Sequence, residues 1–372
     1  MRPIRYPEFE VSGLPRDMGR AVGEAFRDTI RAFAAVAVER VNKTTPVSRA
    51  AALRVAESTL PLAEAYAPDA VEELRGVAEG AGLLLVEVAL LQCRNQLLAE
   101  ATGPREGCTS ISFARPYCET SLLGQNWDAD PALDDFTIVL TRRPTGKPAF
   151  TTLTQAGMIA YIGIAETGLG ICLNALPAPT RAAPAGRFDP PLAGAWGVPH
   201  YYTVRAIYES RSLDEAAEAV RRATRAIPAS LMMCTPQGPA NLEVTVDEVR
   251  VLDWFESGFG LHTNHCCHPA LVPINADFPE LIQSHDRFAR VQALVADRPG
   301  PLSRAAGIGL MQSILRDKDG FPTSICRHVN DRHPQHGFWE SVFSVIIDPA
   351  AKEMWITRGP PDTAPYERYR TA

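Results

Sequence analysis

The chain has 372 residues, of which 46% are hydrophobic and 22% are charged, and its formal net charge is −6. This length is enough for one large domain or two modest ones with a sizeable core, and the mild negative charge argues against a nucleic-acid partner. No run approaches the roughly 18 consecutive apolar residues that a membrane span needs, so we expect no membrane partner.

The N-terminus and the cysteines indicate a reducing compartment. Residues 1–8 lack the apolar core of a secretory signal. The eight cysteines form no CxxC pair, and several lie in apolar stretches, as is typical of buried thiols. We therefore expect a cytoplasmic protein whose thiols are reduced and mostly buried.

The N-terminal part of the chain has helical periodicity. Apolar residues recur at helical spacing over 16–42, which predicts one long amphipathic helix. Ser48 is expected to cap a second helix that Pro61 kinks or splits, and Pro68 to open a third. A fourth is expected over 86–98. These segments predict a helical N-terminal layer.

Short strands replace the helical pattern from Thr109 onward. They are expected at 121–124, 136–142, 149–154, 158–165, 170–173, 231–234, 240–246, 249–254, 323–329, 338–347 and 353–358. Helices are expected at 198–210, at 213–226 behind a capping box at Ser212, and at 284–297 and 303–316, each with a serine in the cap position. This order predicts an α+β domain with two sheets between helical layers.

The segment 177–199 has no periodicity and contains six prolines and three glycines. A loop of this length in a compact domain either covers a binding site or is disordered. We expect it to cover a pocket.

The change from helices to strands falls at the bond between Gly107 and Cys108. A cysteine that becomes N-terminal carries its own base, because the α-amine has a pKa of about 7.7–8.0. Gly107 has no side chain to shield its carbonyl, which permits attack by the Cys108 thiol and an N-to-S acyl shift. The sequence therefore predicts self-cleavage between these two residues. The alternative is an ordinary Gly-Cys dipeptide with a small core cysteine.

Four motifs occur in order along the chain: Glu106-Gly107-Cys108-Thr109, Gly124-Gln125-Asn126-Trp127-Asp128, His262-Thr263-Asn264-His265-Cys266 and Ser324-Ile325-Cys326-Arg327. With the glycine-containing entry at 13–23 and the strand end at 346–348, the chain resembles the acyl-coenzyme A:6-aminopenicillanic acid (isopenicillin N) acyltransferase family of N-terminal-nucleophile hydrolases over nearly its whole length. The resemblance implies a four-layer αββα sandwich. It also implies cleavage into a helical α chain (1–107), released or retained, and a catalytic β chain (108–372).

The same resemblance implies roles for single residues. The nucleophile matches Cys108, the carboxylate that holds its amine and thiol matches Asp128, and the oxyanion-hole amide matches Asn264. The active-site arginine matches Arg327, which would pair with Asp128 and depress the pKa of the nearby amine. A turn aspartate, a turn asparagine and a surface arginine are the ordinary alternatives.

Four further polar residues are expected as oxyanion or substrate groups: Thr109, Ser110, Asn126 and Asn174. Asn174 resembles a second asparagine of related N-terminal-nucleophile enzymes. Ser110 stands where the penicillin-type enzyme has threonine, and the 177–199 region has weak similarity to that enzyme. We therefore do not infer from the resemblance that penicillin is a substrate of this protein.

Two side-chain groups offer competing chemistry. Histidines and cysteines between His262 and His268 are potential zinc ligands. Successive residues of a strand face opposite sides of the sheet, however, and Asn264 already has a role, so we expect no metal. A thiol–imidazole pair of Cys326 with His328 is the other alternative, but neighbours on a strand point apart.

We therefore expect an enzyme that forms an acyl thioester on Cys108 from a small N-acyl amide or acyl-coenzyme A. The acyl group then passes to an amine or to water. No bound cofactor is expected, since acyl-coenzyme A would be a substrate, and the cleaved α chain is the expected protein partner. The alternatives are a linear-amide hydrolase without transferase activity and a non-catalytic binding protein with an uncleaved chain.

Overall fold

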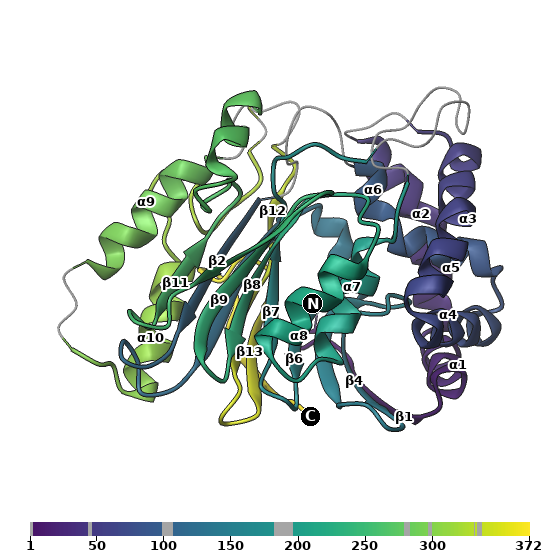
Figure 1. The fold of residues 1–372 in the computed structure, drawn as a ribbon, viewed down its shortest axis with the longest axis horizontal. Coiled ribbons are helices and arrows are strands. Elements are labelled where there is room, and N and C mark those ends of the chain that lie inside the picture. Colours follow the sequence, from purple (N-terminus) through teal and green to yellow (C-terminus); the bar gives the residue numbers. More distant parts are fainter. Residues whose placement is uncertain are drawn as a thin grey trace.

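The computed structural model of this chain describes residues 3–43, 47–98, 107–181, 196–278, 283–296, 300–330, 332 and 337–372. Two β-sheets lie face to face and are covered by helices on both outer sides (Figure 1). The expected α+β architecture, with two sheets between helical layers, is confirmed. Within the described residues, no helix combines the length and apolar character needed to cross a membrane.

The larger sheet, called sheet A here, has the strand order β1-β4-β5-β6-β7-β8-β9-β10. Its strands are β1 (Glu8–Gly13), β4 (Thr137–Pro144), β5 (Phe150–Gln155), β6 (Ile162–Ala165), β7 (Gly170–Asn174), β8 (Ala229–Thr235), β9 (Gly238–Val244) and β10 (Val249–Asp253). Short turns join most consecutive strands, including β4 and β5, so most neighbours are antiparallel.

The smaller sheet, called sheet B, has the order β11-β2-β3-β12-β13-β14. Its strands are β2 (Gly107–Phe113), β3 (Leu122–Ala129), β11 (Phe259–His262), β12 (Glu340–Asp348), β13 (Glu353–Arg358) and β14 (Glu367–Arg370). Strands β2 and β3 are neighbouring interior strands of this sheet and face β7 and β8 of sheet A. The bond between Gly107 and Cys108 therefore lies at the start of a strand that is buried in the sandwich.

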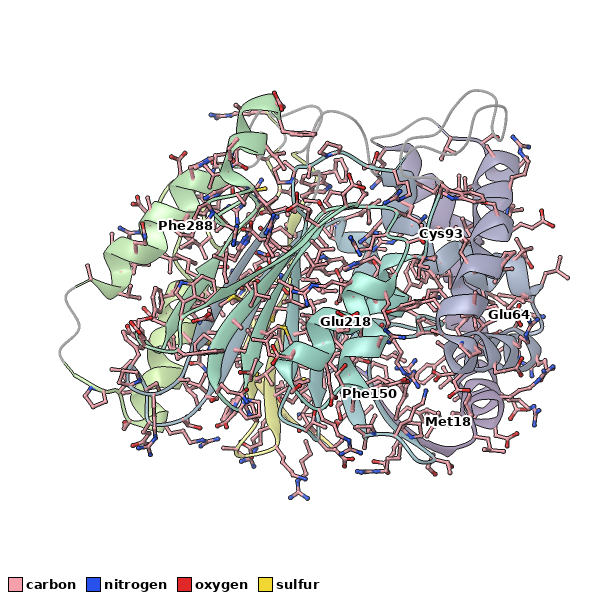
Figure 2. The ribbon with its side chains drawn as sticks, in the orientation of Figure 1. Met18, Glu64, Cys93, Phe150, Glu218 and Phe288 are labelled. Atoms are coloured by element: carbon pink, nitrogen blue, oxygen red, sulfur yellow. The ribbon has the colours of Figure 1, made fainter. Side chains whose placement is uncertain are left out.

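The outer helices complete the layers. Sheet A is covered by α7 (His200–Tyr208) and α8 (Leu213–Arg222), and sheet B by α9 (Ser284–Val295) and α10 (Arg304–Leu315). Figure 2 labels side chains from these layers, with Phe150 in sheet A and Phe288 on α9. The Ser212 and Ser303 hydroxyls accept hydrogen bonds from backbone N–H groups of the first turn, as expected.

The N-terminal helices form a further body beside sheet A (Figure 1). They are α1 (Pro15–Ala25), α2 (Arg27–Asn42), α3 (Arg49–Tyr66), α4 (Pro68–Ala81), α5 (Leu85–Gln92) and α6 (Arg94–Leu98). Ser48 and Pro68 open helices as predicted, and α3 continues through Pro61 without a split. The single helix predicted over 16–42 is wrong, because the chain leaves helical geometry at Phe26.

The N-terminal layer is also not purely helical. Strand β1 pairs in parallel with β4, so the segment before Cys108 contributes an edge strand to sheet A. A local pattern cannot show this, since the partner strand lies far away in sequence.

Three other expectations fail or lie outside the described residues. The strand predicted at 323–329 is absent there, where the chain forms turns and bends. Ser284 is the first residue of α9, and Gln283 occupies its cap position. Most of the predicted loop 177–199 lies outside the described residues, which stop at 181 and resume at 196.

Candidate functional site

Cys108 is the second residue of β2 and is almost completely buried, with 1% of its surface exposed. The antiparallel register places it opposite Trp127 of β3 and places Gly107 opposite Asp128. Residues that lie opposite each other in such a pair share a face of the sheet. The Cys108 side chain therefore points toward sheet A, whereas Asp128 lies on the other face, beside the bond that precedes Cys108.

Asp128 crowds the Gly107 backbone. A Cβ atom added at Gly107 would lie 2.9 Å from Asp128 Oδ2, closer than real Cβ contacts allow. The fully buried Asp128 Oδ1 accepts a 2.7 Å hydrogen bond from Ser341 Oγ, while Oδ2 accepts none from the residues that the structure describes. Burial raises the pKa of Asp128, and the charges of Arg327 and Arg287 oppose this shift.

Asn264 holds the backbone of Cys108. Its Oδ1 accepts a 2.9 Å hydrogen bond from the Cys108 N–H and a 2.8 Å bond from Arg287 Nη2. Both partners can only donate, so the oxygen of the amide faces Cys108. The expected oxyanion donor, Nδ2, donates to Ala175 O at 3.0 Å.

Arg327 approaches Asp128 from the segment before β12. Its Nε lies 3.6 Å from Asp128 Oδ2, and only 4% of the residue is exposed. Its backbone N–H donates to Ser341 Oγ at 3.0 Å, so Ser341 connects the backbone of Arg327 with the Asp128 carboxylate. Burial lowers the pKa of Arg327, and Asp128 opposes this shift.

Arg287 of α9 was not anticipated from the sequence. Its buried guanidinium donates through Nη1 to Cys108 O at 2.5 Å and to Thr109 Oγ1 at 2.8 Å, and through Nη2 to Asn264 Oδ1. A helical arginine is usually exposed, and nothing in its neighbours distinguishes this one. Only the packing of α9 against sheet B shows its position.

The remaining predicted residues form hydrogen bonds in the two sheets around Cys108. Ser110 Oγ donates to Asn174 Oδ1 at 2.5 Å, and Asn174 Nδ2 donates to Thr263 O at 2.9 Å. These bonds join the two sheets beside Cys108. Asn126 Nδ2 instead donates to the carbonyl oxygens of Leu315 and Ile325 on the opposite face of sheet B.

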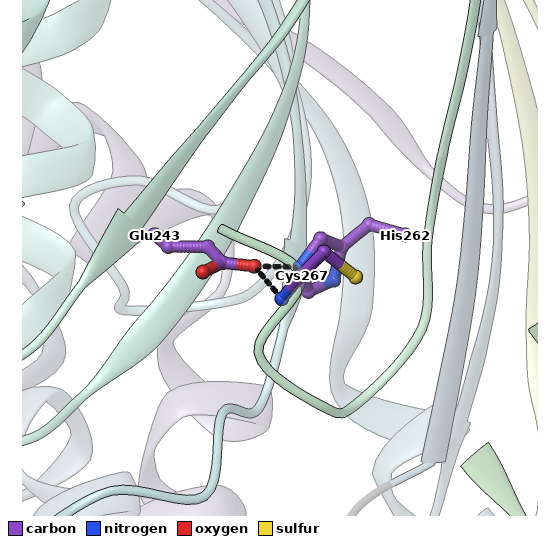
Figure 3. A group of neighbouring side chains, drawn as sticks. All are labelled: Glu243, His262 and Cys267. Carbon is purple, nitrogen blue, oxygen red and sulfur yellow. Dashed lines mark hydrogen bonds and ion pairs between the residues drawn. The ribbon is translucent and has the colours of Figure 1, made fainter. Parts of the chain in front are cut away.

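The potential metal ligands of the 262–268 segment lie only partly together. Glu243, His262 and Cys267 form one group (Figure 3), in which His262 Nε2 lies 2.8 Å from Glu243 Oε1. His262 Nδ1 lies 2.9 Å from Thr263 O, so both ring nitrogens already have protein partners. The hydrogen-bonding pattern indicates an ion pair rather than a ligand set.

The predicted separation of Cys326 from His328 is wrong. Cys326 Sγ lies 3.9 Å from His328 Nε2, and both contact Asp362 Oδ1, at 3.2 and 2.9 Å. The expectation fails because residues two positions apart, unlike direct neighbours, share a face even on a strand, and this segment forms turns and bends instead. Asp362 also pairs with Lys318 at 3.1 Å, so its charge is already compensated.

Comparison with known proteins supports one family. The model of the family "acyl-coenzyme A:6-aminopenicillanic acid acyl-transferase" matches residues 115–363. The chain is 26% identical over 364 residues to the 40 kDa form of acyl-coenzyme A:6-aminopenicillanic-acid-acyltransferase from Emericella nidulans, covering 94% of this chain and 92% of that protein.

Among solved structures, penicillin V acylase from Agrobacterium tumefaciens aligns with a TM-score of 0.40 and 12% identity, over 69% of this chain and 77% of that one. A mutant of conjugated bile acid hydrolase from Clostridium perfringens aligns with a TM-score of 0.39 and 10% identity, over 70% of this chain and 96% of that one.

Proposed function

Because the chain belongs to the acyl-coenzyme A:6-aminopenicillanic acid acyltransferase family, we propose that it cuts itself before Cys108 and then transfers acyl groups through the Cys108 thiol. The observation that carries the proposal is the arrangement around one peptide bond. Asp128 lies against Gly107 on one side of this bond, and Asn264 holds the Cys108 nitrogen on the other.

The first step is an N-to-S acyl shift. The sulfur of Cys108 attacks the carbonyl carbon of Gly107, the bond from that carbon to the Cys108 nitrogen breaks, and the nitrogen gains the proton that the thiol loses. Water then hydrolyses the Gly107 thioester, giving a new carboxylate, a free thiol and a free α-amine. Asp128, whose buried Oδ2 accepts no hydrogen bond from the described residues, is suited to accept a proton here.

In turnover, the amine of Cys108 acts as the base for its own thiol. The sulfur attacks the acyl carbon of an amide or acyl thioester, the amine takes the thiol proton, and this proton then goes to the departing amine or thiol. Asn264 Oδ1 is placed to accept a hydrogen bond from this amine. The guanidinium groups of Arg287 and Arg327 favour its neutral, basic form.

The acyl group on Cys108 then passes to an amine or to water. This chemistry uses groups of the chain and the substrate alone, and acyl-coenzyme A would enter as a donor. We propose small N-acyl amides and acyl thioesters as substrates. All eight cysteines are free and seven are buried, which is compatible with a reducing cytoplasm.

We also propose that the segment 1–107 stays attached after cleavage as a partner chain. Besides β1, it supplies Glu73, whose fully buried carboxylate pairs with Arg142 Nε at 2.6 Å and with Arg205 Nη1 at 2.8 Å. Release would leave two buried guanidinium groups without this partner, which is strongly unfavourable.

The direct test is the mass of the purified protein, followed by activity. Two fragments joining at 107–108 are expected, with the second alkylated at an N-terminal cysteine. N-acyl amides and acyl-coenzyme A donors would then be screened against several amines, with product analysis to separate transfer from hydrolysis. An intact chain whose Cys108 resists alkylation and which turns over none of these substrates would instead indicate a non-catalytic binding protein.

A further inference from the structure

A buried ion pair joins the two sheets beside Cys108. Glu243 of β9 and His262 of β11 are both fully buried, and they meet at 2.8 Å (Figure 3). Both ring nitrogens of His262 face acceptors, namely Glu243 Oε1 and Thr263 O, so both carry a proton and the ring is charged. Burial alone would lower the pKa of His262, but Cys267 and Glu243 raise it to about 10.

The Glu243 carboxylate also organises the turn that follows His262. Its Oε1 accepts the backbone N–H of Cys267 at 2.5 Å, and its Oε2 accepts that of His268 at 3.0 Å. One carboxylate of sheet A therefore holds both ends of the segment 262–268. Asn264 lies within this segment, and its side chain holds Cys108 N.

We propose that Glu243 and His262 are positioning residues that hold Asn264 against the backbone nitrogen of Cys108. This inference rests on the proposed function, because the position of the Cys108 nitrogen matters for the proposed self-cleavage. Among the hydrogen bonds of the described residues, neither side chain reaches Gly107 or Cys108, so they act through Asn264. Hydrogen bonds between charged groups in a buried site are strong and directional, which suits a device that fixes one amide.

The first test compares self-cleavage rates of Glu243→Gln and Glu248→Gln. Glu248 is an exposed carboxylate directly before β10 and pairs with Arg250, so its replacement is the matched control. We expect the Glu243 variant to cut about ten-fold more slowly or worse at neutral pH, and the control to cut within about two-fold of the wild type.

The pH profile separates positioning from general damage. His262 faces Glu243 from β9 and Cys267 from its own turn, with His265 also nearby. Without the carboxylate, burial shifts His262 toward its neutral form. The ratio of the Glu243→Gln rate to the wild-type rate should therefore fall as pH rises through the pKa of His262 in the variant, which burial places below the ordinary histidine value. A ratio that is the same at every pH contradicts the proposal.

A second measurement does not depend on cleavage. Cys108→Ala keeps the chain intact under the proposed chemistry and retains the backbone N–H of residue 108. Adding Glu243→Gln to this variant should speed hydrogen exchange in two separate peptides, one that contains residue 108 and one that contains residues 267–268. Faster exchange at 267–268 with unchanged exchange at 108 overturns the positioning role. If the wild-type chain proves uncut, the proposed function fails while this readout still decides the inference.

If Glu243→Gln does not fold, the double variant Glu243→Gln/His262→Gln keeps the test open, because it removes both buried charges together. We expect the double variant to fold and still to cut about ten-fold or more slowly than the wild type. The Glu243→Gln change would place an amide NH2 group where one carboxylate oxygen accepts the N–H of Cys267 or His268. Cutting at the wild-type rate would overturn the proposal.

Discussion

Two buried clusters in this molecule are built alike, but the pKa of the central carboxylate is lowered in one and raised in the other. In each, one carboxylate lies near two arginines: Glu73 between the N-terminal helices and sheet A, and Asp128 beside Cys108. Both oxygens of Glu73 accept short hydrogen bonds from guanidinium groups, and the pKa of Glu73 is lowered even though burial alone would raise it. Asp128 has no such bond to Oδ2, and its pKa is raised.

The difference supports a structural role for the Glu73 cluster and is the basis for the chemical role that we propose for the Asp128 cluster. A fully paired carboxylate stabilises the fold only as long as every partner is present. A buried carboxylate with an unused oxygen costs stability, and such groups concentrate at functional sites because they can accept a proton. We infer that Glu73 holds the two chain segments together and that Asp128 acts on the scissile bond.

The largest expected effect comes from Cys108. Cys108→Ala should leave one uncut chain without acyl transfer, because no other group supplies the sulfur, and Cys108→Ser should cut slowly, if at all. Intact mass over time measures both. Cys118→Ala, a buried cysteine elsewhere in sheet B's core, is the control and should cut normally. Two fragments from the Cys108→Ala chain would show that another group opens the bond.

Replacement of Glu73 tests the structural half of the comparison. Glu73→Gln should lower the free energy of unfolding by about 3–5 kcal/mol, because Arg142 and Arg205 lose their buried counter-charge. Glu64→Gln, an exposed carboxylate that pairs with Arg75, should cost at most about 1 kcal/mol. Denaturant titration of the uncut Cys108→Ala chain measures both. Equal losses would remove the distinction between the clusters.

Replacement of Asp128 tests the functional half. Asp128→Asn keeps an oxygen for the Ser341 hydroxyl but cannot take up a proton, so cutting should slow by about 10²- to 10⁴-fold. Stability should change far less than in Glu73→Gln. Asp135→Asn, in which the original carboxylate is exposed, is the control. A variant that cuts at the wild-type rate would show that Asp128 has no part in the reaction.

A smaller effect is expected at Gly107. Gly107→Ala would force its Cβ within 2.9 Å of Asp128 Oδ2, so the carboxylate must move and cutting should slow about ten-fold. Gly309→Ala on α10 meets no atom within 4 Å and should raise stability by up to about 1 kcal/mol. If Gly107→Ala cuts at the wild-type rate, self-cleavage does not depend on the present position of the Asp128 carboxylate.

The smallest effect is a difference in acid stability. The lowered pKa of Glu73 stabilises the fold above its unfolded value of 4.5, and this contribution is lost as pH falls through the lower folded pKa. The raised pKa of Asp128 has the opposite sign: protonation as pH falls toward 3.8 favours the fold. Unfolding free energies from neutral pH to pH 4 should therefore fall less steeply in Glu73→Gln and more steeply in Asp128→Asn.

Local patterns were sufficient for much of the fold. The caps at Ser48, Ser212 and Ser303, the start of α4 at Pro68 and the β4–β5 turn depend on residues a few positions apart, so the sequence alone determines them. The order of helices and strands also predicted the layers. The four motif residues were found through resemblance, and the structure brings them together around one bond, although their catalytic roles stay predictions.

Tertiary structure decided what depends on distant partners. Strand β1 exists because β4 pairs with it, and Arg287 and Glu243 reach the site region only because α9 and β9 pack where they do. Register placed the Cys108 thiol and the Asp128 carboxylate on opposite faces of sheet B, so Asp128 lies beside the bond rather than the sulfur. Burial and pairing then set the charge of each buried group, and neither is encoded in residue type alone.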